Sequence, residues 1–394
     1  MGDTPDLSSE EGPGSSFAGQ ESPAEIQVRV ESSGSESENE SDGAASIKST
    51  RSCASHTLRY IEENGRRYCD DSYFMPNDET ELTRLNVVHQ IYLILLDGRL
   101  TSAPLTTNSP RILDVGTGPG DWAIEMSAEY PNATIIASDL GVFDSGLGHL
   151  SLPNVDFQLA DAQTEWTFHD PFDLVHLRGL SGAFQDWHTV YTQAFTHLKP
   201  GGYIEVSDVD PAADTISSPA ADASSYLRIY AEALRAAAQE TGYPRDLHHL
   251  RPSALIDAGF TDVSVLERTI PVGLWPDDLH EKTIGKMALI VLLEGLEAYA
   301  LRPLTRHARW SREAALELCE NVKTELLSAD RLTARVRVVT ARKPSSYGQK
   351  RDAVMARAMQ RVRLLNERLT AEREGEEDPD NEDDTDEEEK LEAE

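Results

Sequence analysis

The chain has 394 residues and a formal net charge of −33, and this length suggests one large domain or two of ordinary size. The charge is concentrated at the two ends, because residues 1–46 carry a net charge of −10 and residues 371–394 carry −13. An acidic chain without a dominant basic face argues against direct nucleic-acid binding as the main function, since such binding depends on cationic side chains.

Two acidic tails, 1–52 and 371–394, are predicted to be disordered. The first is rich in Ser, Gly and Glu, and the second consists largely of Asp and Glu. Neither can bury enough apolar surface to offset the roughly 1–2 kcal/mol of backbone entropy that ordering each residue costs. The tails either solubilise the chain or bind a basic partner.

Cysteine usage and hydropathy predict a protein of the cell interior. Cys53, Cys69 and Cys319 lie far apart, with neither a disulfide framework nor metal-ligand spacing. The most apolar run, MALIVLLEGL, is too short to span a bilayer. We therefore expect an intracellular protein of the cytoplasm or nucleus that binds no membrane. No metal site is predicted, because His248 and His249 have no further ligands at metal spacing.

Ordered structure is predicted for 53–345, as a single domain. It begins with a helix over 76–97, where Pro76 stands near the start, acidic residues fill the first turn and apolar residues recur at helical spacing. A core over 110–270 then alternates strands with helices. This alternation implies a mostly parallel sheet with helices on both faces, which is an α/β fold.

A helical insertion over 271–333 and a last strand over 334–343 follow this core. Inserted helices commonly cover the carboxyl ends of the strands, where open α/β sheets bind ligands. We therefore expect the insertion to cap an active site. Residues 346–370 form a basic amphipathic pattern, and the helix that it predicts is either solvated or a docking element for a protein partner.

The sequence RILDVGTGPGDWAIEM joins a predicted strand to a predicted helix through Gly116, Gly118 and Gly120. Glycines suit such a turn because they adopt positive φ and let the backbone approach a ligand. A dinucleotide fingerprint needs glycine at the place of Asp121, and a nucleotide-phosphate loop needs a Gly-Lys-Ser/Thr sequence that the turn does not have. With Asp114 two residues before the first glycine, the turn instead resembles that of class I S-adenosylmethionine-dependent methyltransferases.

Three acidic residues at the ends of successive strands match the functional groups of that cofactor. Asp114 would face the ammonium of the methionine part, and Asp139 would accept both ribose hydroxyls, as the acidic residue does in dinucleotide folds. Asp161 would accept from the adenine amino group, while the backbone N–H of Ala162 donates to the ring. The glycine turn and these carboxylates together predict S-adenosylmethionine as the cofactor.

The stretch from about Arg59 to Pro344 resembles the LaeA-like methyltransferases of fungi, also called TAM-domain methyltransferases. The matching strings include NGRRY, PNDETELTRLNVVHQIYLILLDGRL, FDLVHLRGLSGAFQDW and QAFTHLKPGGYIEVSD. The resemblance implies a Rossmann-like seven-stranded class I methyltransferase sheet, an N-terminal lid and roles in secondary metabolism. It implies a cofactor site formed by Tyr73, Asp114, Gly116, Thr117, Gly118, Gly120, Asp139, Leu140, Asp161 and Ala162.

Methyl transfer is an in-line displacement that requires close approach of the nucleophile and exclusion of water, and a base only when the nucleophile must lose a proton. His176 and Arg178 are the candidate catalytic residues, because LVHLRG places both at the carboxyl end of a buried strand. His176 is either a base or a side chain that packs near the cofactor. Arg178 either binds an acidic substrate or forms a structural ion pair.

We predict an S-adenosylmethionine-dependent methyltransferase that acts on a small-molecule acceptor in fungal secondary metabolism. The alternative is a LaeA-like nuclear regulator that acts through protein partners, with the predicted basic helix as one docking element. An NAD(P)-dependent dehydrogenase is disfavoured, because Asp121 replaces the third glycine of the dinucleotide fingerprint.

Overall fold

The computed structural model describes residues 24–28, 58–141, 152–209, 225–329, 331–345, 359 and 362. The strands of its main sheet are β4 (Arg111–Val115), β5 (Thr134–Asp139), β6 (Val155–Leu159), β7 (Phe172–Arg178), β8 (Leu198–Val209), β9 (Thr261–Pro271) and β10 (Thr333–Arg342). The α-helices are α1 (Glu79–Leu95), α2 (Asp121–Glu129), α3 (Trp187–His197), α4 (Tyr226–Thr241), α5 (Pro252–Asp257), α6 (Leu279–Arg306) and α7 (Arg312–Ser328), with a short 3-10 helix η3 (His248–Leu250).

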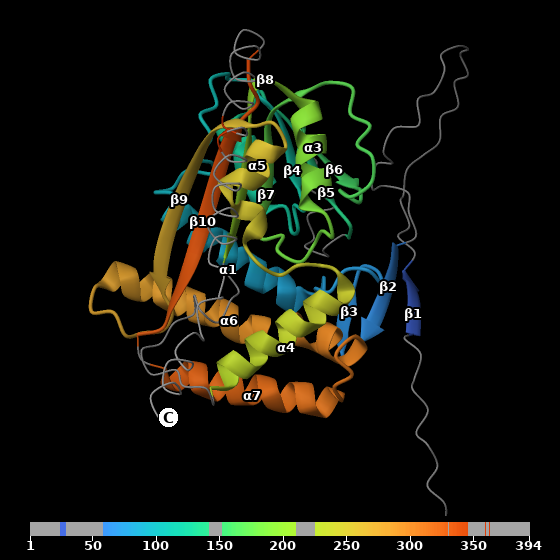
Figure 1. Ribbon diagram of the computed structural model, residues 1–394, viewed down its shortest axis with the longest axis vertical. Helices are drawn as coiled ribbons and strands as arrows, with labels where there is room; N and C mark the ends of the chain where they lie inside the picture. Colours follow the sequence, from blue (N-terminus) through green and yellow to red (C-terminus); the bar gives the residue numbers. More distant parts are fainter. Residues whose placement is uncertain are drawn as a thin grey trace, which may run out of the picture.

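The main sheet has seven strands in the order β6-β5-β4-β7-β8-β10-β9 (Figure 1). The pairs from β6 to β8 are parallel, whereas β10 runs antiparallel to both β8 and β9. The predicted α/β fold with a seven-stranded Rossmann-like sheet is thus confirmed. The last strand expected from the sequence is β10, which lies between β8 and β9, and β9 occupies the edge of the sheet.

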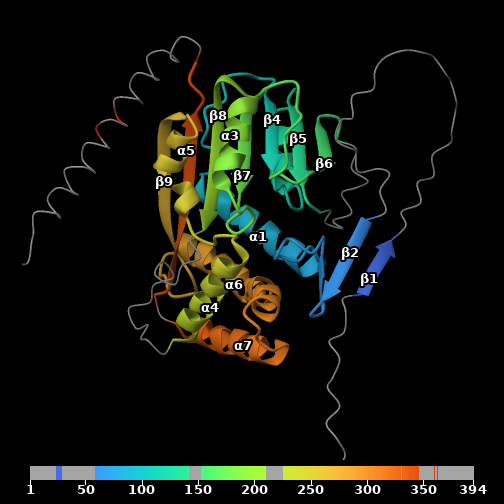
Figure 2. The same ribbon diagram turned by 45° about the vertical axis from the view of Figure 1, so that its right-hand side comes forward.

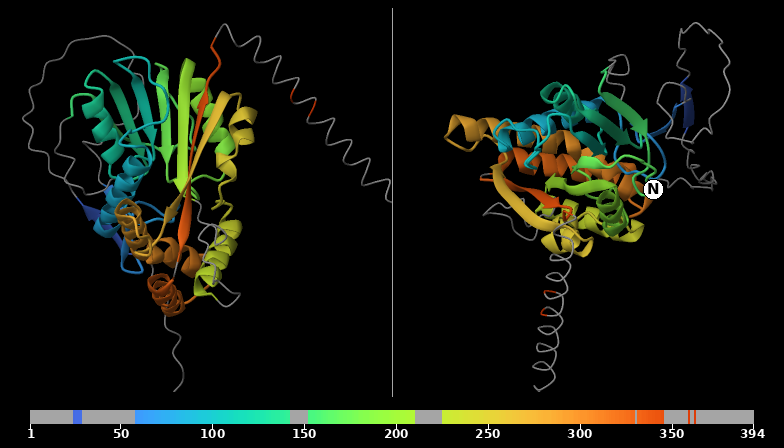
Figure 3. Two further views of the ribbon diagram at one scale, coloured as in Figure 1. Left: turned by 90° about the vertical axis from the view of Figure 1, so that its left-hand side faces the viewer. Right: turned by 90° about the horizontal axis from the view of Figure 1, so that it is seen from above.

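Each face of the sheet is covered by helices (Figure 3). On one face α3 and α5 pack against the sheet in a core that includes the fully buried Phe172 of β7, Tyr191 of α3 and Leu255 of α5. On the other face α2 buries Trp122 and Met126 against β4 and β5. Side chains that accept hydrogen bonds from the first turn begin five of the helices, as capping residues do: Asp78, Asp186, Ser225, Asp278 and Ser311.

The helices α4, α6 and α7 form a layer beyond one end of the main sheet, and α1 lies between this layer and the strands (Figure 2). We call these three helices the cap. The cap has its own hydrophobic core, which includes the fully buried Leu301, Leu304 and Val322. It is fastened to the sheet at Gly285 of α6, whose carbonyl oxygen accepts from the N–H of Gly273 at 2.9 Å.

A small antiparallel sheet beside α1 was not predicted from the sequence. It consists of β1 (Ala24–Val28), β2 (Leu58–Glu63) and β3 (Arg66–Tyr68). The structure departs from the predicted disordered tail at β1, because this segment pairs with a strand more than thirty residues later in the chain. Glu63 of β2 forms ion pairs with Arg302 and Arg306 of α6, so the small sheet is tied to the cap.

Several predicted segments lie outside the described residues. They are the acidic tail 371–394, the remainder of the tail 1–52 and, except for two positions, the basic helix 346–370. Within the part of the chain that the structure describes, no helix is both long and apolar enough to cross a membrane.

Candidate active site

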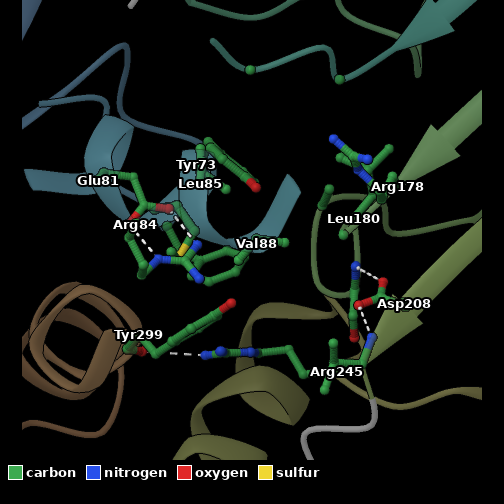
Figure 4. A pocket seen from close by; sticks show the side chains of 18 of the residues that line it. Tyr73, Glu81, Arg84, Leu85, Val88, Arg178, Leu180, Asp208, Arg245 and Tyr299 are labelled. Carbon is green, nitrogen blue, oxygen red and sulfur yellow. Dashed lines mark hydrogen bonds and ion pairs between the residues drawn. The ribbon is translucent and has the colours of Figure 1, made fainter. Parts of the chain in front are cut away.

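A cavity of about 290 Å³ opens at the carboxyl ends of β4, β5 and β7. This volume lies near the lower end of the range for ligand-binding pockets. The glycine turn bounds the cavity on one side, and α1, α4 and α6 bound it on the other. Figure 4 shows labelled side chains from α1, β7, β8, α6 and the loop after α4 around the cavity. Every residue predicted for the cofactor or for catalysis lines the cavity, with the exception of Gly120.

The glycine turn has the backbone conformation that only glycine adopts without strain. Gly116, Gly118 and Gly120 have φ values of 67°, 58° and 90°. A Cβ atom on Gly116 would lie 2.5 Å from a methyl carbon of Leu180, and one on Gly120 would lie 2.7 Å from the Phe157 ring. Gly120 therefore serves the turn and the start of α2, whereas Gly116 also leaves space at the cavity wall.

Asp114, at the carboxyl half of β4, is a buried carboxylate with two side-chain partners. It is 2% exposed and accepts from the Thr117 hydroxyl at 2.6 Å. Its other oxygen lies 2.7 Å from Nδ1 of His176 on the neighbouring strand β7. Two hydrogen bonds thus fix the direction of a carboxylate that borders the cavity.

His176 is held by contacts on several sides. Its ring stacks on Trp122 with centroids 3.8 Å apart and planes 4° apart, and the side chain is 2% exposed. On the next strand Glu205 lies directly beside it, so Asp114, His176 and Glu205 form a row across three strands. Burial raises the pKa of the Glu205 carboxyl, and His176 acts in the opposite direction.

Asp139 is bound to the glycine turn as well as to its own strand end. One carboxylate oxygen accepts from the N–H of Gly118 at 2.8 Å, and the other accepts from the N–H of Gly141 at 3.1 Å. Burial raises the pKa of this carboxyl, although both hydrogen bonds oppose the shift. The following residue, Leu140, also lines the cavity.

Asp161 and Ala162 follow β6 and close the cavity beyond β5. The Asp161 carboxylate accepts from the N–H of Gln163 at 2.9 Å, which folds the turn after the strand. The carbonyl of Ala162 accepts from the indole of Trp166 at 3.0 Å. The carboxylates of Asp114, Asp139 and Asp161 therefore border one cavity, from three neighbouring strands.

Tyr73 reaches the cavity from the segment between β3 and α1. Arg302 of the cap donates to the carbonyl oxygens of both Asp70 and Tyr73 at 2.7 Å. The same guanidinium forms an ion pair with Glu63. This segment is thus held against the cap by hydrogen bonds.

Arg178, at the end of β7, borders the cavity without a carboxylate partner within 4 Å among the described residues. Its guanidinium donates to Nδ1 of His89 at 3.1 Å and lies 5.1 Å from the ring centre of Tyr92. Burial lowers its pKa, and the charges of Asp114, Asp121 and Glu205 act in the opposite direction. Within the described part of the chain Arg178 therefore forms no ion pair, and its role stays a prediction.

Sequence reasoning missed several side chains that line the cavity. Glu81 and Arg84 of α1 form a buried ion pair with hydrogen bonds of 2.6 and 2.8 Å. Arg245 and Tyr299 come from the loop after α4 and from α6. No local pattern marks these residues, because α1, α4 and α6 meet only in the folded chain. Across the described ranges, no group of three or more His, Cys, Asp or Glu side chains could hold a metal ion.

Comparison with known proteins finds a methyltransferase family model and relatives named as methyltransferases or as regulators of secondary metabolism. The family model described as "Methyltransferase domain" matches residues 87–265. The "Secondary metabolism regulator LAE1" of Cochliobolus heterostrophus is 35% identical over 72% of this chain and 94% of its own length. The "Methyltransferase pytC" of Aspergillus terreus is 31% identical over 73% of this chain and 90% of its own. The "Protein-methionine methyltransferase laeA" of Emericella nidulans is 31% identical over 77% and 82%, respectively.

Proposed function

Because the chain belongs to the LaeA-like family of S-adenosylmethionine-dependent methyltransferases, we propose that it transfers a methyl group to a small-molecule acceptor held in the cavity between glycine turn and cap. The cofactor supplies a methyl carbon bonded to a positively charged sulfur. The observation that carries the proposal is the meeting of three strand-end carboxylates and a glycine turn around one cavity.

The residues present fit this cofactor by their chemistry. Positive φ at Gly116 and Gly118 turns the backbone at the cavity wall without side chains. Asp114 offers a fixed carboxylate for an ammonium group, and hydrogen bonds from Thr117 and His176 hold it. Asp139 and Asp161 offer acceptors for hydroxyl and amino groups, as the sequence predicts.

We assign His176 the role of a positioning residue. Its Nδ1 atom is bound to Asp114 and its ring is stacked on Trp122, so it holds the carboxylate that faces the cofactor. A base in contact with the acceptor would need a ring nitrogen directed at the reacting atoms. The contacts of His176 support the first role better than the second.

Arg178 is proposed to bind the carboxylate of the cofactor's methionine part. Its charged neighbours Asp114 and Asp121 belong to the glycine turn and its flank, which would place the guanidinium beside the amino-acid end of the cofactor. A guanidinium without an ion-pair partner in the described chain is suited to a carboxylate ligand, which it can bind through two parallel hydrogen bonds.

Calorimetric titration of the purified full-length chain with S-adenosylhomocysteine tests this function directly. We expect saturable binding with a Kd in the micromolar range, which corresponds to about −8 kcal/mol. Absence of binding by the unmodified chain would refute the assignment of the cavity to this cofactor.

A second function is favoured by the names of two relatives, one a "Secondary metabolism regulator" and the other a "Protein-methionine methyltransferase". The same site would then serve a regulator in the nucleus, and the acceptor would be a protein methionine. Incubation of the full chain with methyl-labelled cofactor, with and without small-molecule extract, separates the two. Label in protein alone supports the regulator, whereas label that moves into low-molecular-weight products supports the enzyme of a pathway.

A further inference from the structure

Arg245 is a second guanidinium at the cavity that lacks a carboxylate within 4 Å in the described chain. It lies in the loop between α4 and η3, on the cap side of the cavity (Figure 4). One of its terminal nitrogens donates to the carbonyl oxygen of Tyr299 at 3.2 Å. A guanidinium has five N–H donors, so a hydrogen bond to one neutral carbonyl leaves most of its donors available to a ligand.

Two aromatic rings hold this guanidinium in place. Its central carbon lies 4.4 Å from the ring centre of Phe74 and 4.9 Å from that of Tyr299. The two rings are themselves 6.2 Å apart. Contacts of this kind fix the plane of the guanidinium without neutralising its charge.

The two arginines that are fully buried in the described chain, Arg84 and Arg302, are both paired. Arg84 is bound to Glu81 through two hydrogen bonds, and Arg302 is bound to Glu63. Burying a charge without a partner is costly, so proteins rarely leave one unpaired in their interior. Arg178 and Arg245 are the exceptions among the cavity-lining arginines with buried guanidinium groups, and both border space that a ligand can enter.

The two exceptions face different parts of the cavity. Arg178 has the carboxylates of the glycine turn and its flank as neighbours, as described above. Around Arg245 the polar neighbours are the phenols of Tyr73, Tyr230 and Tyr299 and the carboxylate of Asp208. Burial raises the pKa values of Tyr73 and Tyr230 well above the usual tyrosine value, so these phenols stay neutral.

The charge of Asp208 acts on Arg245, but the described contacts include no ion pair between them. Its oxygens accept from the backbone N–H groups of Ser181 at 2.7 Å and Val209 at 2.9 Å. One oxygen also lies 3.6 Å from Nε2 of His249. The Asp208 carboxylate is therefore bound to the wall of the cavity, and the positive charge of Arg245 remains open to a ligand.

We propose that Arg245 binds a carboxylate of the methyl acceptor, and that the apolar or aromatic body of this acceptor packs against Phe74, Tyr230 and Tyr299. The inference rests on the proposed methyltransferase function and specifies the substrate class for it. Bidentate binding of a carboxylate to a pre-oriented guanidinium provides both affinity and direction. Arg245 is thus a specificity-determining residue on the cap side of the cavity.

Matched pairs of fluorinated ligands test the proposal by binding alone. The full chain is saturated with S-adenosylhomocysteine and titrated with 4-fluorobenzoate, 4-fluorophenylacetate and 4-fluorocinnamate and with the corresponding amides, followed by fluorine NMR. For at least one pair we expect the carboxylate to bind about tenfold more tightly than the amide, since a charge-assisted hydrogen bond replaces a neutral one. Equal affinities in every pair, or no binding of any carboxylate, would overturn the proposal.

Variants of Arg245 test whether this residue causes the preference for the carboxylate. Arg245→Gln is expected to reduce the preference for the carboxylate to less than about twofold, and Arg245→Lys to retain part of it. Arg251→Gln is the matched control, because Arg251 is exposed at the start of α5 and does not line the cavity. A carboxylate preference that persists in Arg245→Gln would overturn the assignment of this residue. If Arg245→Gln fails to fold, the comparison of acids with amides on the unmodified chain decides.

Binding of S-adenosylhomocysteine separates this inference from its premise. A chain that binds S-adenosylhomocysteine but shows no carboxylate preference refutes the role of Arg245 and leaves the methyltransferase function intact. A chain that does not bind S-adenosylhomocysteine refutes the proposed function, and the inference that rests on it is refuted as well.

Discussion

Replacement of Asp114 by Asn should separate cofactor binding from folding. The side chain is buried, accepts from Thr117 at 2.6 Å and lies 2.7 Å from Nδ1 of His176. An asparagine has nearly the same shape, and its amide oxygen can still accept one of these hydrogen bonds. What the substitution removes is the negative charge that we assign to the ammonium of the cofactor.

The expected magnitudes follow from these contacts. A hydrogen bond to a charged group contributes about 1.5–3 kcal/mol, so loss of the charge should weaken binding of S-adenosylhomocysteine by about 10- to 150-fold. For folding, Asp114→Asn should cost no more than about 1–2 kcal/mol. Asp114→Ala leaves the Thr117 hydroxyl and the His176 ring without their partner, and each unsatisfied group costs about 1–3 kcal/mol.

Calorimetry gives the affinity of each variant, and urea unfolding gives its free energy of unfolding. Asp173→Asn is the matched control, because Asp173 lies at the opposite end of β7 and accepts there from Arg111 and Lys199. It should leave the affinity for S-adenosylhomocysteine unchanged. Binding by Asp114→Asn as tight as that of the unmodified chain would refute the reasoning.

Three further predictions concern the neighbours of Asp114 and the cap. His176→Phe keeps a ring that can stack on Trp122 but loses the hydrogen bond to Asp114. Calorimetry should show that the affinity for S-adenosylhomocysteine falls about two- to tenfold. An unchanged affinity would contradict a positioning role for His176. Gly285→Ala would force a Cβ into the carbonyl oxygen of Gly273, and we expect it to lower the free energy of unfolding by about 1–3 kcal/mol despite better helix propensity. In the control Gly295→Ala the Cβ would meet the Tyr299 ring at 3.1 Å and Cδ of Arg84 at 3.5 Å, so this variant should cost less in the same urea titration. The third prediction concerns pH, because burial raises the pKa of Glu205 in the folded state. Between the ordinary glutamate pKa near 4.5 and the raised value, the folded chain therefore binds more protons than the unfolded chain. As the pH rises through that window, this carboxyl lowers the free energy of unfolding. Urea titrations across the window should show a smaller dependence of the free energy of unfolding on pH in Glu205→Gln than in the unmodified chain. An identical dependence in both proteins would show that Glu205 does not cause it.

Asp114 and Arg178 illustrate how far local sequence carries a site prediction. The strand that contains Asp114 and the glycines that follow it are adjacent in the chain, so their spacing alone predicts a turn, a helix and a class of cofactor. The position of Arg178 at a strand end could also be predicted from the sequence. Its hydrogen-bond partner could not be predicted, because His89 lies 89 residues earlier in the chain, on helix α1.

The sequence by itself determined the alternation of strands and helices, the glycine turn and the acidic residues at three strand ends, since each depends on residues close together in the chain. The tertiary structure alone decided what surrounds them. It places His176 against Asp114, sets Glu205 beside His176, and brings Arg245 to Tyr299 across 54 residues. Such pairs arise from the packing of distant elements, and no local periodicity records which elements will meet.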